Sequence, residues 1–157
     1  MKMLIAGKWV EGKETIEVRD PFDNSLIDTV PSGTADDIKA AIDAAEEGFK
    51  VSRALPVHER VRILRKAADI IDANAEEFAV IIAREGSKTI SEARGEVYRA
   101  GQTMLISAEE ARRINGETIP FDTNIGSENR LGYYFRFPIG IIAAITPFND
   151  PLNLVAH

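Results

Sequence analysis

The sequence predicts an α/β protein, and three observations lead to this class. Its first part holds short β-favouring runs separated by Gly, Pro, Asp and Asn. Between residues 34 and 115, apolar residues recur at the three- and four-residue spacing of amphipathic helices. Near the end, "IGIIAAI" is a continuous apolar run, typical of a strand buried on both faces of a parallel sheet. We therefore expect β-hairpins, then a helical layer, then the first strand of a parallel sheet.

The amino-terminal part is expected to form two hairpins. "MLIAGKWVEG" places two short apolar strands around a turn at Gly7-Lys8. Two further strand candidates, Thr15–Arg19 and Leu26–Val30, flank the turn signal "DPFDN".

The first helix is expected after Thr34, whose side chain can cap it, with Asp36 and Asp37 in the electropositive first turn. Its apolar face should hold Ile38, Ala41, Ile42, Ala45 and Phe49. The next helix begins at Pro56, and its buried stripe should hold Val61, Leu64, Ala68 and Ile71. Asn74 with Glu77 has the pattern of a new capping pair, so a third helix is expected there, ending at Gly86.

Thr89 with Glu92 repeats the capping pattern and predicts a fourth helix that ends before Gly116. Its inward residues should be Val97, Met104, Leu105 and Ala108. Gly95 and Gly101 are unusual inside it, since each costs about 1 kcal/mol relative to Ala. Close packing or a functional surface would explain them, and the alternative is that they are simply tolerated.

Composition excludes several classes of function. The net charge of −6, without a basic run, argues against nucleic-acid binding. No apolar stretch is long enough to span a membrane, and the amino terminus is a poor signal peptide, so we expect a cytoplasmic protein. Cysteine is absent and there are two histidines, without metal-ligand spacing, so we expect no metal site.

The segment that carries the chemistry follows the alternating strand predicted over Arg130–Phe137. A buried strand over Ile139–Ile145 should lead into a polar loop and a helix that starts near Pro151. Ligands of α/β proteins collect where such strands end. Two roles are open for Asn149 at that point: it caps the helix, or it donates hydrogen bonds to an anion or oxyanion.

The stretch "RFPIGIIAAITPFNDPL" resembles the R-x-P-x-G-x-x-x-x-I-T-P-W-N-x-P segment of the aldehyde dehydrogenase superfamily, with Phe148 in place of the usual Trp. The hairpin with Trp9, "DPFDNSLIDTV", the helix with Arg60, "EGSK" and "GETIP" also fit the amino-terminal region of that family in order. The likeness covers essentially the whole chain and is closest to lactaldehyde and phosphonoacetaldehyde-type members.

The resemblance implies the amino-terminal portion of a larger fold. Residues 1–122 and 139–157 would belong to an incomplete, Rossmann-like NAD(P)-binding domain. Residues 123–138 would form a linker and a strand of the oligomerisation arm of a homodimer or homotetramer. We expect the chain alone to be inactive, because the cysteine nucleophile and the general-base Glu of the family lie outside it.

For the whole enzyme, the resemblance implies oxidation of an aldehyde to its carboxylic acid with NAD or NADP, through a Cys thioester. Asn149 would donate to the oxyanion. The residues implied to line the cofactor cleft are Ile145, Thr146, Pro147 and Phe148. Phe148 keeps an apolar wall there but removes the N–H donor of the usual Trp.

The substrate tunnel would be bordered by the helix face that carries Asp150, Leu154 and His157 at positions i, i+4 and i+7, with Arg99 offering an anion anchor from the fourth helix. Read without the family, Arg99 is a solvated charge, Asp150 a first-turn acid and His157 a terminal residue. A polar lining favours a small hydroxylated or anionic aldehyde, such as lactaldehyde or a phosphorylated or phosphono-aldehyde.

Two alternatives remain at this point. One is a non-catalytic helical interaction or assembly module. The other is an acylating or phosphate reductase built on the same scaffold.

Overall fold

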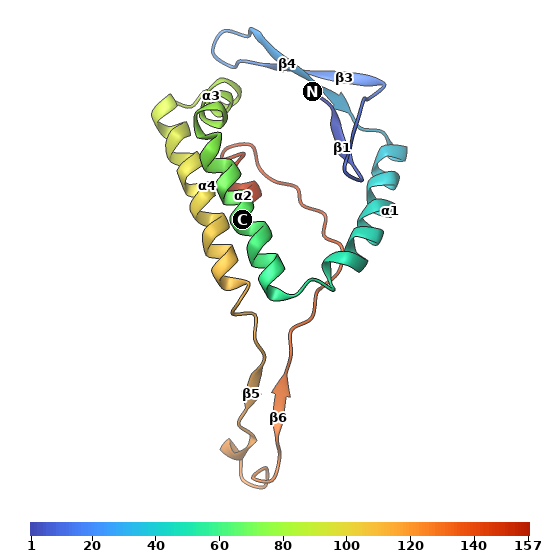
Figure 1. Ribbon diagram of the computed structural model, residues 1–157, viewed down its shortest axis with the longest axis vertical. Coiled ribbons are helices and arrows are strands. Elements are labelled where there is room, and N and C mark those ends of the chain that lie inside the picture. Colours follow the sequence, from blue (N-terminus) through green and yellow to red (C-terminus); the bar gives the residue numbers. More distant parts are fainter.

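The computed structural model describes all 157 residues, from Met1 to His157. It is elongated: two amino-terminal hairpins lie at one end, a layer of helices lies in the middle and a third hairpin projects from the other end (Figure 1). All three sheets are two-stranded and antiparallel. The α/β class is confirmed. None of the helices combines the length and apolar character needed to cross a bilayer.

Strands β1 (Met3–Ile5) and β2 (Lys8–Val10) form the first predicted hairpin. Its turn is Ala6-Gly7, and both residues have positive φ (52° and 74°), as a tight two-residue turn requires. The turn predicted at Gly7-Lys8 is therefore wrong by one residue, because Lys8 already pairs with Ile5. The second hairpin, β3 (Glu14–Arg19) with β4 (Leu26–Ser32), confirms the two predicted strands and lengthens both.

Helix α1 (Ala35–Ser52) begins as predicted. The Thr34 hydroxyl accepts from the Asp37 backbone N–H at 3.2 Å, and the Asp37 carboxylate accepts from the Thr34 N–H at 2.9 Å. The apolar face expected to be buried is not: no α1 residue is buried, and Ile38 and Ile42 are exposed. Periodicity identifies a face that can be covered, but the three other long helices pack among themselves, and this face is covered only in part, at Ala45 and Phe49 (Figure 1).

Helices α2 (Val57–Ala73) and α3 (Ala75–Gly86) follow the predicted division. On α2, Val61, Ala68 and Ile71 are buried and Leu64 is partly buried. The capping role expected for Asn74 is wrong, because its side-chain amide donates to the Ile70 carbonyl at 2.7 Å and so closes α2. The left-handed residue that ends α3 is Ser87 rather than Gly86.

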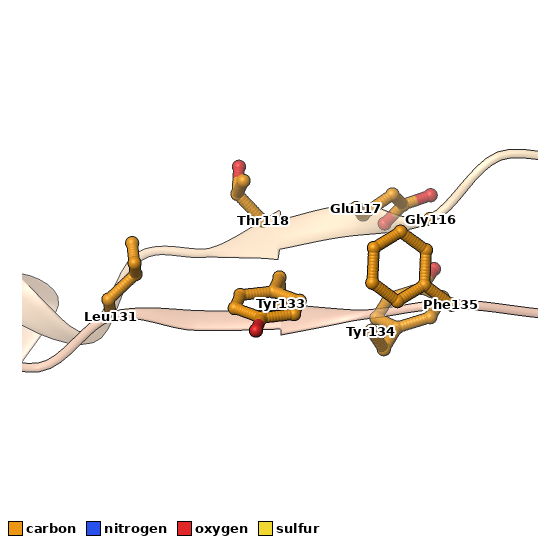
Figure 2. A pocket seen from close by; sticks show the side chains of 7 residues that line it. All are labelled: Gly116, Glu117, Thr118, Leu131, Tyr133, Tyr134 and Phe135. Atoms are coloured by element: carbon orange, nitrogen blue, oxygen red, sulfur yellow. The ribbon is translucent and has the colours of Figure 1, made fainter.

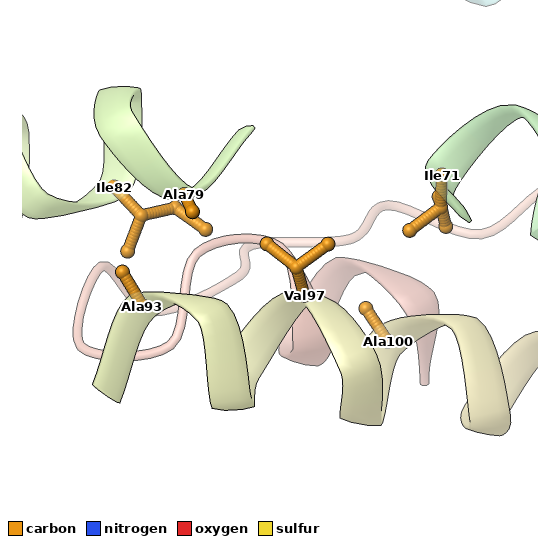
Figure 3. Packing of buried hydrophobic residues seen from close by; sticks show 6 residues of the cluster. All are labelled: Ile71, Ala79, Ile82, Ala93, Val97 and Ala100. Carbon is orange, nitrogen blue, oxygen red and sulfur yellow. The ribbon is translucent and has the colours of Figure 1, made fainter. Parts of the chain in front are cut away.

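Helix α4 (Ile90–Glu110) starts with the predicted capping box and packs against α2 and α3. Figure 3 shows the core, to which the three helices contribute Ile71, Ala79, Ile82, Ala93, Val97 and Ala100. Gly101 is buried, and a Cβ there would lie 3.0 Å from the Asp72 carboxylate, which confirms close packing at this glycine. Leu105 does not point inward and is 36% exposed.

The third hairpin pairs β5 (Glu117–Ile119) with β6 (Gly132–Tyr134), and a 3-10 turn, η1 (Phe121–Thr123), lies between them. The strand predicted over Arg130–Phe137 is thus shorter than expected. The strand predicted over Ile139–Ile145 is not formed: this segment has no partner strand, and Ile145 is 98% exposed. A parallel strand needs neighbours for its N–H and C=O groups, and none of the six strands provides them.

Candidate functional site

The chain returns from the third hairpin to α4 and ends in the short helix α5 (Asn153–Ala156) (Figure 1). Leu152 and Ala156 pack against the core cluster of α2, α3 and α4. The loop Thr146–Asn149, in which sequence analysis places the chemistry, immediately precedes this docked segment. The carboxyl end of the loop is therefore held in place by the packing of the following segment against α4.

Glu96 is the centre of this docking. It lies on the inner face of α4 between Ala93 and Ala100, and it is fully buried. One carboxylate oxygen accepts from the backbone N–H groups of Leu152 at 2.8 Å and Asn153 at 3.3 Å. The other accepts from Lys88 Nζ at 2.6 Å. Three donors, one of them charged, offset the cost of removing this acid from water.

Lys88 joins Glu96 to Asp150, to which it also donates a hydrogen bond. Burial alone would lower the pKa of Lys88, but the hydrogen bonds to Asp150 and Glu96 outweigh it and raise that pKa above its ordinary value. The hydrogen bond from Lys88 lowers the pKa of Asp150 against a smaller effect of burial, and the charges of Lys88 and Arg99 add to the lowering. Lys88 and Asp150 are both charged at neutral pH.

Arg99 reaches the same group, with its Nη2 3.3 Å from the second carboxylate oxygen of Asp150. Arg99 and Asp150, two of the residues singled out from sequence, are thus brought together. They border a polar cleft of about 410 Å³, whose lining is completed by Ser87, Lys88, Glu92 and Gly95. Gly95 lies in the lining of this cleft, which favours a functional surface as the reason for a glycine inside α4.

The other two predicted substrate residues lie apart from this cleft. Asp150 lies before α5, and its carbonyl accepts from the Leu154 N–H at 3.0 Å. The helical face is therefore formed for one turn. Leu154 is partly buried, whereas His157 follows the helix and is exposed. Neither side chain lines the cleft.

Asn149 is exposed and its side chain makes no hydrogen bond within the chain. Helix α5 starts with Leu152 as its N-cap and without a side-chain cap from its own sequence, since Glu96 accepts from its first N–H groups instead. The capping interpretation of Asn149 is therefore wrong. Beside it, Ile145 and Phe148 present almost their whole side chains to solvent, on either side of Thr146 and Pro147.

Sequence reasoning missed Lys88, Glu96 and the hydrogen bond from the Thr103 hydroxyl to the Asn153 side-chain oxygen at 3.1 Å. One signal was present: Glu96 is an acid at an inward position of a helix whose neighbouring inward residues are Ala and Val. Acids are almost never fully buried without a partner. The signal indicates that a partner exists but does not identify it.

A second hollow lies on the third hairpin (Figure 2). It has a volume of about 410 Å³ and is lined by Gly116, Glu117, Thr118, Leu131, Tyr133, Tyr134 and Phe135. The Tyr133 and Phe135 rings meet edge to face, with their centroids 5.6 Å apart. Its lining is mainly apolar and brings no set of charged groups together, so it offers packing surface rather than chemistry.

Comparison with known proteins identifies the arrangement. The model of the aldehyde dehydrogenase family matches residues 9–157. The chain is 42% identical over 155 residues to 3-sulfolactaldehyde dehydrogenase of Priestia aryabhattai, covering 99% of this chain and 32% of that protein. It is 39% identical over 155 residues to lactaldehyde dehydrogenase of Methanocaldococcus jannaschii, with the same coverage of both chains.

Among solved structures, the fold matches NADP-dependent glyceraldehyde-3-phosphate dehydrogenase of Bacillus halodurans, determined in complex with NADP. The TM-score is 0.90 at 33% identity, covering 99% of this chain and 33% of that one. The chain thus spans about a third of the length of the relatives it matches.

Proposed function

The chain belongs to the aldehyde dehydrogenase family, and from this premise we propose that it forms the amino-terminal part of a cytoplasmic, NAD(P)-dependent enzyme that oxidises a small polar aldehyde to its carboxylic acid. The observation that carries the proposal is the free Asn149 amide, set in the loop directly before the segment anchored on α4. The likeness to two named aldehyde dehydrogenases over nearly the whole chain supports it.

Asn149 is the proposed oxyanion donor. Attack of a thiolate on an aldehyde carbonyl leaves negative charge on the carbonyl oxygen, and a fixed amide N–H aimed at that oxygen stabilises the transition state. The side chain is suited to this role, because no group of the chain occupies its two donors.

The residues Ile145, Thr146, Pro147 and Phe148 are proposed to line one wall of the cofactor cleft. Their exposed apolar side chains, with one hydroxyl among them, suit contact with a flat aromatic ring. When bound, NAD or NADP supplies the hydride acceptor. The NADP complex of the Bacillus halodurans relative supports this choice of cofactor.

The thioester route also needs a cysteine nucleophile and a general-base Glu. The chain contains no cysteine, so the nucleophile would come from outside these residues. What this chain contributes is the oxyanion donor, part of the cofactor wall and part of the substrate lining. The 157 residues alone are therefore proposed to be inactive.

The substrate is proposed to be small and polar, either hydroxylated or anionic. In the cleft, Lys88 is held by two carboxylates, whereas most donors of the Arg99 guanidinium remain free. That planar group suits a carboxylate, phosphate or sulfonate. The names of the two relatives, one acting on an anionic and one on a neutral hydroxyaldehyde, support this class. Asp150 is proposed to contribute to the same lining, and Leu154 and His157, which lie outside this cleft, to border the substrate path beyond it.

For the assembled enzyme we propose a homodimer or homotetramer built through the third hairpin. Residues 1–122 and 139–157 would belong to the cofactor domain and 123–138 to the arm. Because β5 pairs with β6, the hairpin argues for starting the arm at Glu117 instead. Its exposed Leu131, Tyr133 and Phe135 suit an interface between subunits.

The test is Asn149→Ala in a full-length enzyme that carries these residues. kcat should fall by about 10²–10³, the usual loss for one oxyanion donor, with the cofactor Kd unchanged. The matched control is Asn115→Ala, which removes an exposed amide after α4, outside the proposed arm, and should leave kcat unaltered. If Asn149→Ala lowers only the melting temperature, the proposed role is wrong.

A further inference from the structure

We propose that Glu96, acting with Lys88, is a positioning residue that sets where Asn149 lies. This inference rests on the proposed oxyanion role of Asn149. Glu96 does not contact substrate or cofactor in this scheme. It acts through the backbone, by fixing the segment that starts one residue after Asn149.

The loop has few other constraints. No hydrogen bond joins Phe135–Asn149 to the rest of the chain, and this stretch is almost entirely exposed. The constraints begin at Asp150, which Lys88 and Arg99 hold, and continue at Leu152 and Asn153. Consecutive Cα atoms are about 3.8 Å apart, so a displacement of Asp150 is passed directly to Asn149. The contacts that this chain supplies to fix Asn149 therefore act from its carboxyl side.

The Glu96 carboxylate takes part in both sets of contacts. One oxygen holds the backbone of Leu152 and Asn153, and the other holds the ammonium of Lys88, which in turn holds Asp150. The single buried acid therefore fixes the segment at both of its ends.

The charge of Glu96 matters as well as its shape. Glutamine has the same size and its carbonyl oxygen can still accept from the backbone N–H groups. Its NH₂ group would then face the ammonium of Lys88, a donor against a donor. Lys88 would keep only Asp150 as a partner, and the link from Glu96 through Lys88 to Asp150 would be lost, which leaves Arg99 as the contact between α4 and Asp150. Misplacement of a catalytic group by about 1 Å can cost about 10²-fold in rate.

The experiment is a double-mutant cycle in the full-length enzyme: Glu96→Gln, Asn149→Ala and both together. Glu96→Gln should lower kcat by about 10–100-fold, with the cofactor KM nearly unchanged. In the Asn149→Ala background, the same substitution should change kcat by less than about threefold, because the group it positions is gone. The control is Glu109→Gln on the same helix, which also loses a 2.6 Å ion pair, to Arg65, but far from the loop.

The outcomes separate the two proposals. If Asn149→Ala leaves kcat intact, the oxyanion role itself fails. If Asn149→Ala costs about 10²–10³ while Glu96→Gln costs the same factor in both backgrounds, Glu96 is only structural and the positioning proposal is overturned. Should Glu96→Gln not fold, Lys88→Met replaces it in the cycle, because it leaves the Glu96 carboxylate able to accept from the backbone and removes the Lys88 ammonium that joins Glu96 to Asp150. The same additive result would overturn the proposal.

Discussion

Replacing Arg99 by alanine tests whether the cleft on α4 selects anionic aldehydes. The Arg99 guanidinium lies 3.3 Å from Asp150, longer than the usual 2.7–2.9 Å of a charged hydrogen bond, and its side chain is 52% exposed. It offers five N–H donors and uses one of them on Asp150. The guanidinium is therefore loosely held, and a carboxylate, phosphate or sulfonate in the cleft can accept from two of the remaining donors.

The magnitude follows from this geometry. A hydrogen bond to a charged group contributes about 1.5–3 kcal/mol. Because half of the Arg99 side chain is exposed, solvent screening places the effect in the lower part of that range, at about 1.5–2 kcal/mol. Arg99→Ala should then lower kcat/KM for an anionic short aldehyde by about 10–30-fold. A neutral aldehyde of the same length should change by less than about threefold, because it makes no charged hydrogen bond.

The assay compares kcat/KM for an anionic and a neutral short aldehyde in the wild-type enzyme, Arg99→Ala and Arg94→Ala. Arg94 is the matched control: it lies on the same helix, is similarly exposed and pairs with Glu76 at 2.7 Å, but it does not line the cleft. Equal losses of kcat/KM on both substrates would show that Arg99 is only a surface charge. A wild-type preference for hexanal over both would refute the polar lining itself.

Two further predictions concern stability. Val97→Ala deletes two buried methyl groups from the core and should lower the free energy of unfolding by about 1–3 kcal/mol, twice the range for Ile→Val, which would appear as a lower melting temperature. The control is Val80→Ala, whose side chain is nearly half exposed, and equal shifts of the two variants would contradict the packing shown in Figure 3. The hydrogen bond from Lys88 lowers the pKa of Asp150. The pair therefore stabilises the fold fully at pH values above 3.8, the ordinary pKa of Asp, and this stabilisation is lost as the pH falls through the lowered pKa. Asp150→Asn should therefore lower the melting temperature near neutral pH, and this difference should narrow on acidification below about pH 3.8; a constant difference would show that Asp150 acts without its charge.

Local signals in the sequence predicted the local structure well. The N-cap at Thr34 and the capping box at Thr89 form as expected, because an N-cap and its partner lie three residues apart and need nothing else. Apart from the cap expected at Asn74 and the turn placed one residue late at Gly7-Lys8, the failures lie where partners are distant. The apolar face of α1 and the run Ile139–Ile145 both have the pattern of buried elements, but the rest of this chain covers the first only in part, at Ala45 and Phe49, and leaves the second exposed. A pattern reports what a segment can bury, not whether a partner is present.

The same difference between what the sequence predicts and what it misses holds for the candidate site. Arg99, Asp150 and the loop that ends at Asn149 were found from the resemblance to the family, and the structure brings the first two together. The anchor was not found, because the bonds from Glu96 to Leu152 and Asn153 cross 56 and 57 residues of sequence. Helical periodicity shows only that an acid lies on the inner face of α4.

Stability alone does not explain an acid at that position. Replacing a buried ion pair by apolar residues of similar volume is often neutral or stabilising, because neither charge then has to be removed from water. A methionine at position 96 would fill the same buried place on α4, but it could not accept from the N–H groups of Leu152 and Asn153 or hold Lys88 against Asp150. What the carboxylate adds is a fixed place for the segment that follows Asn149, which is why we expect its loss to appear in kcat.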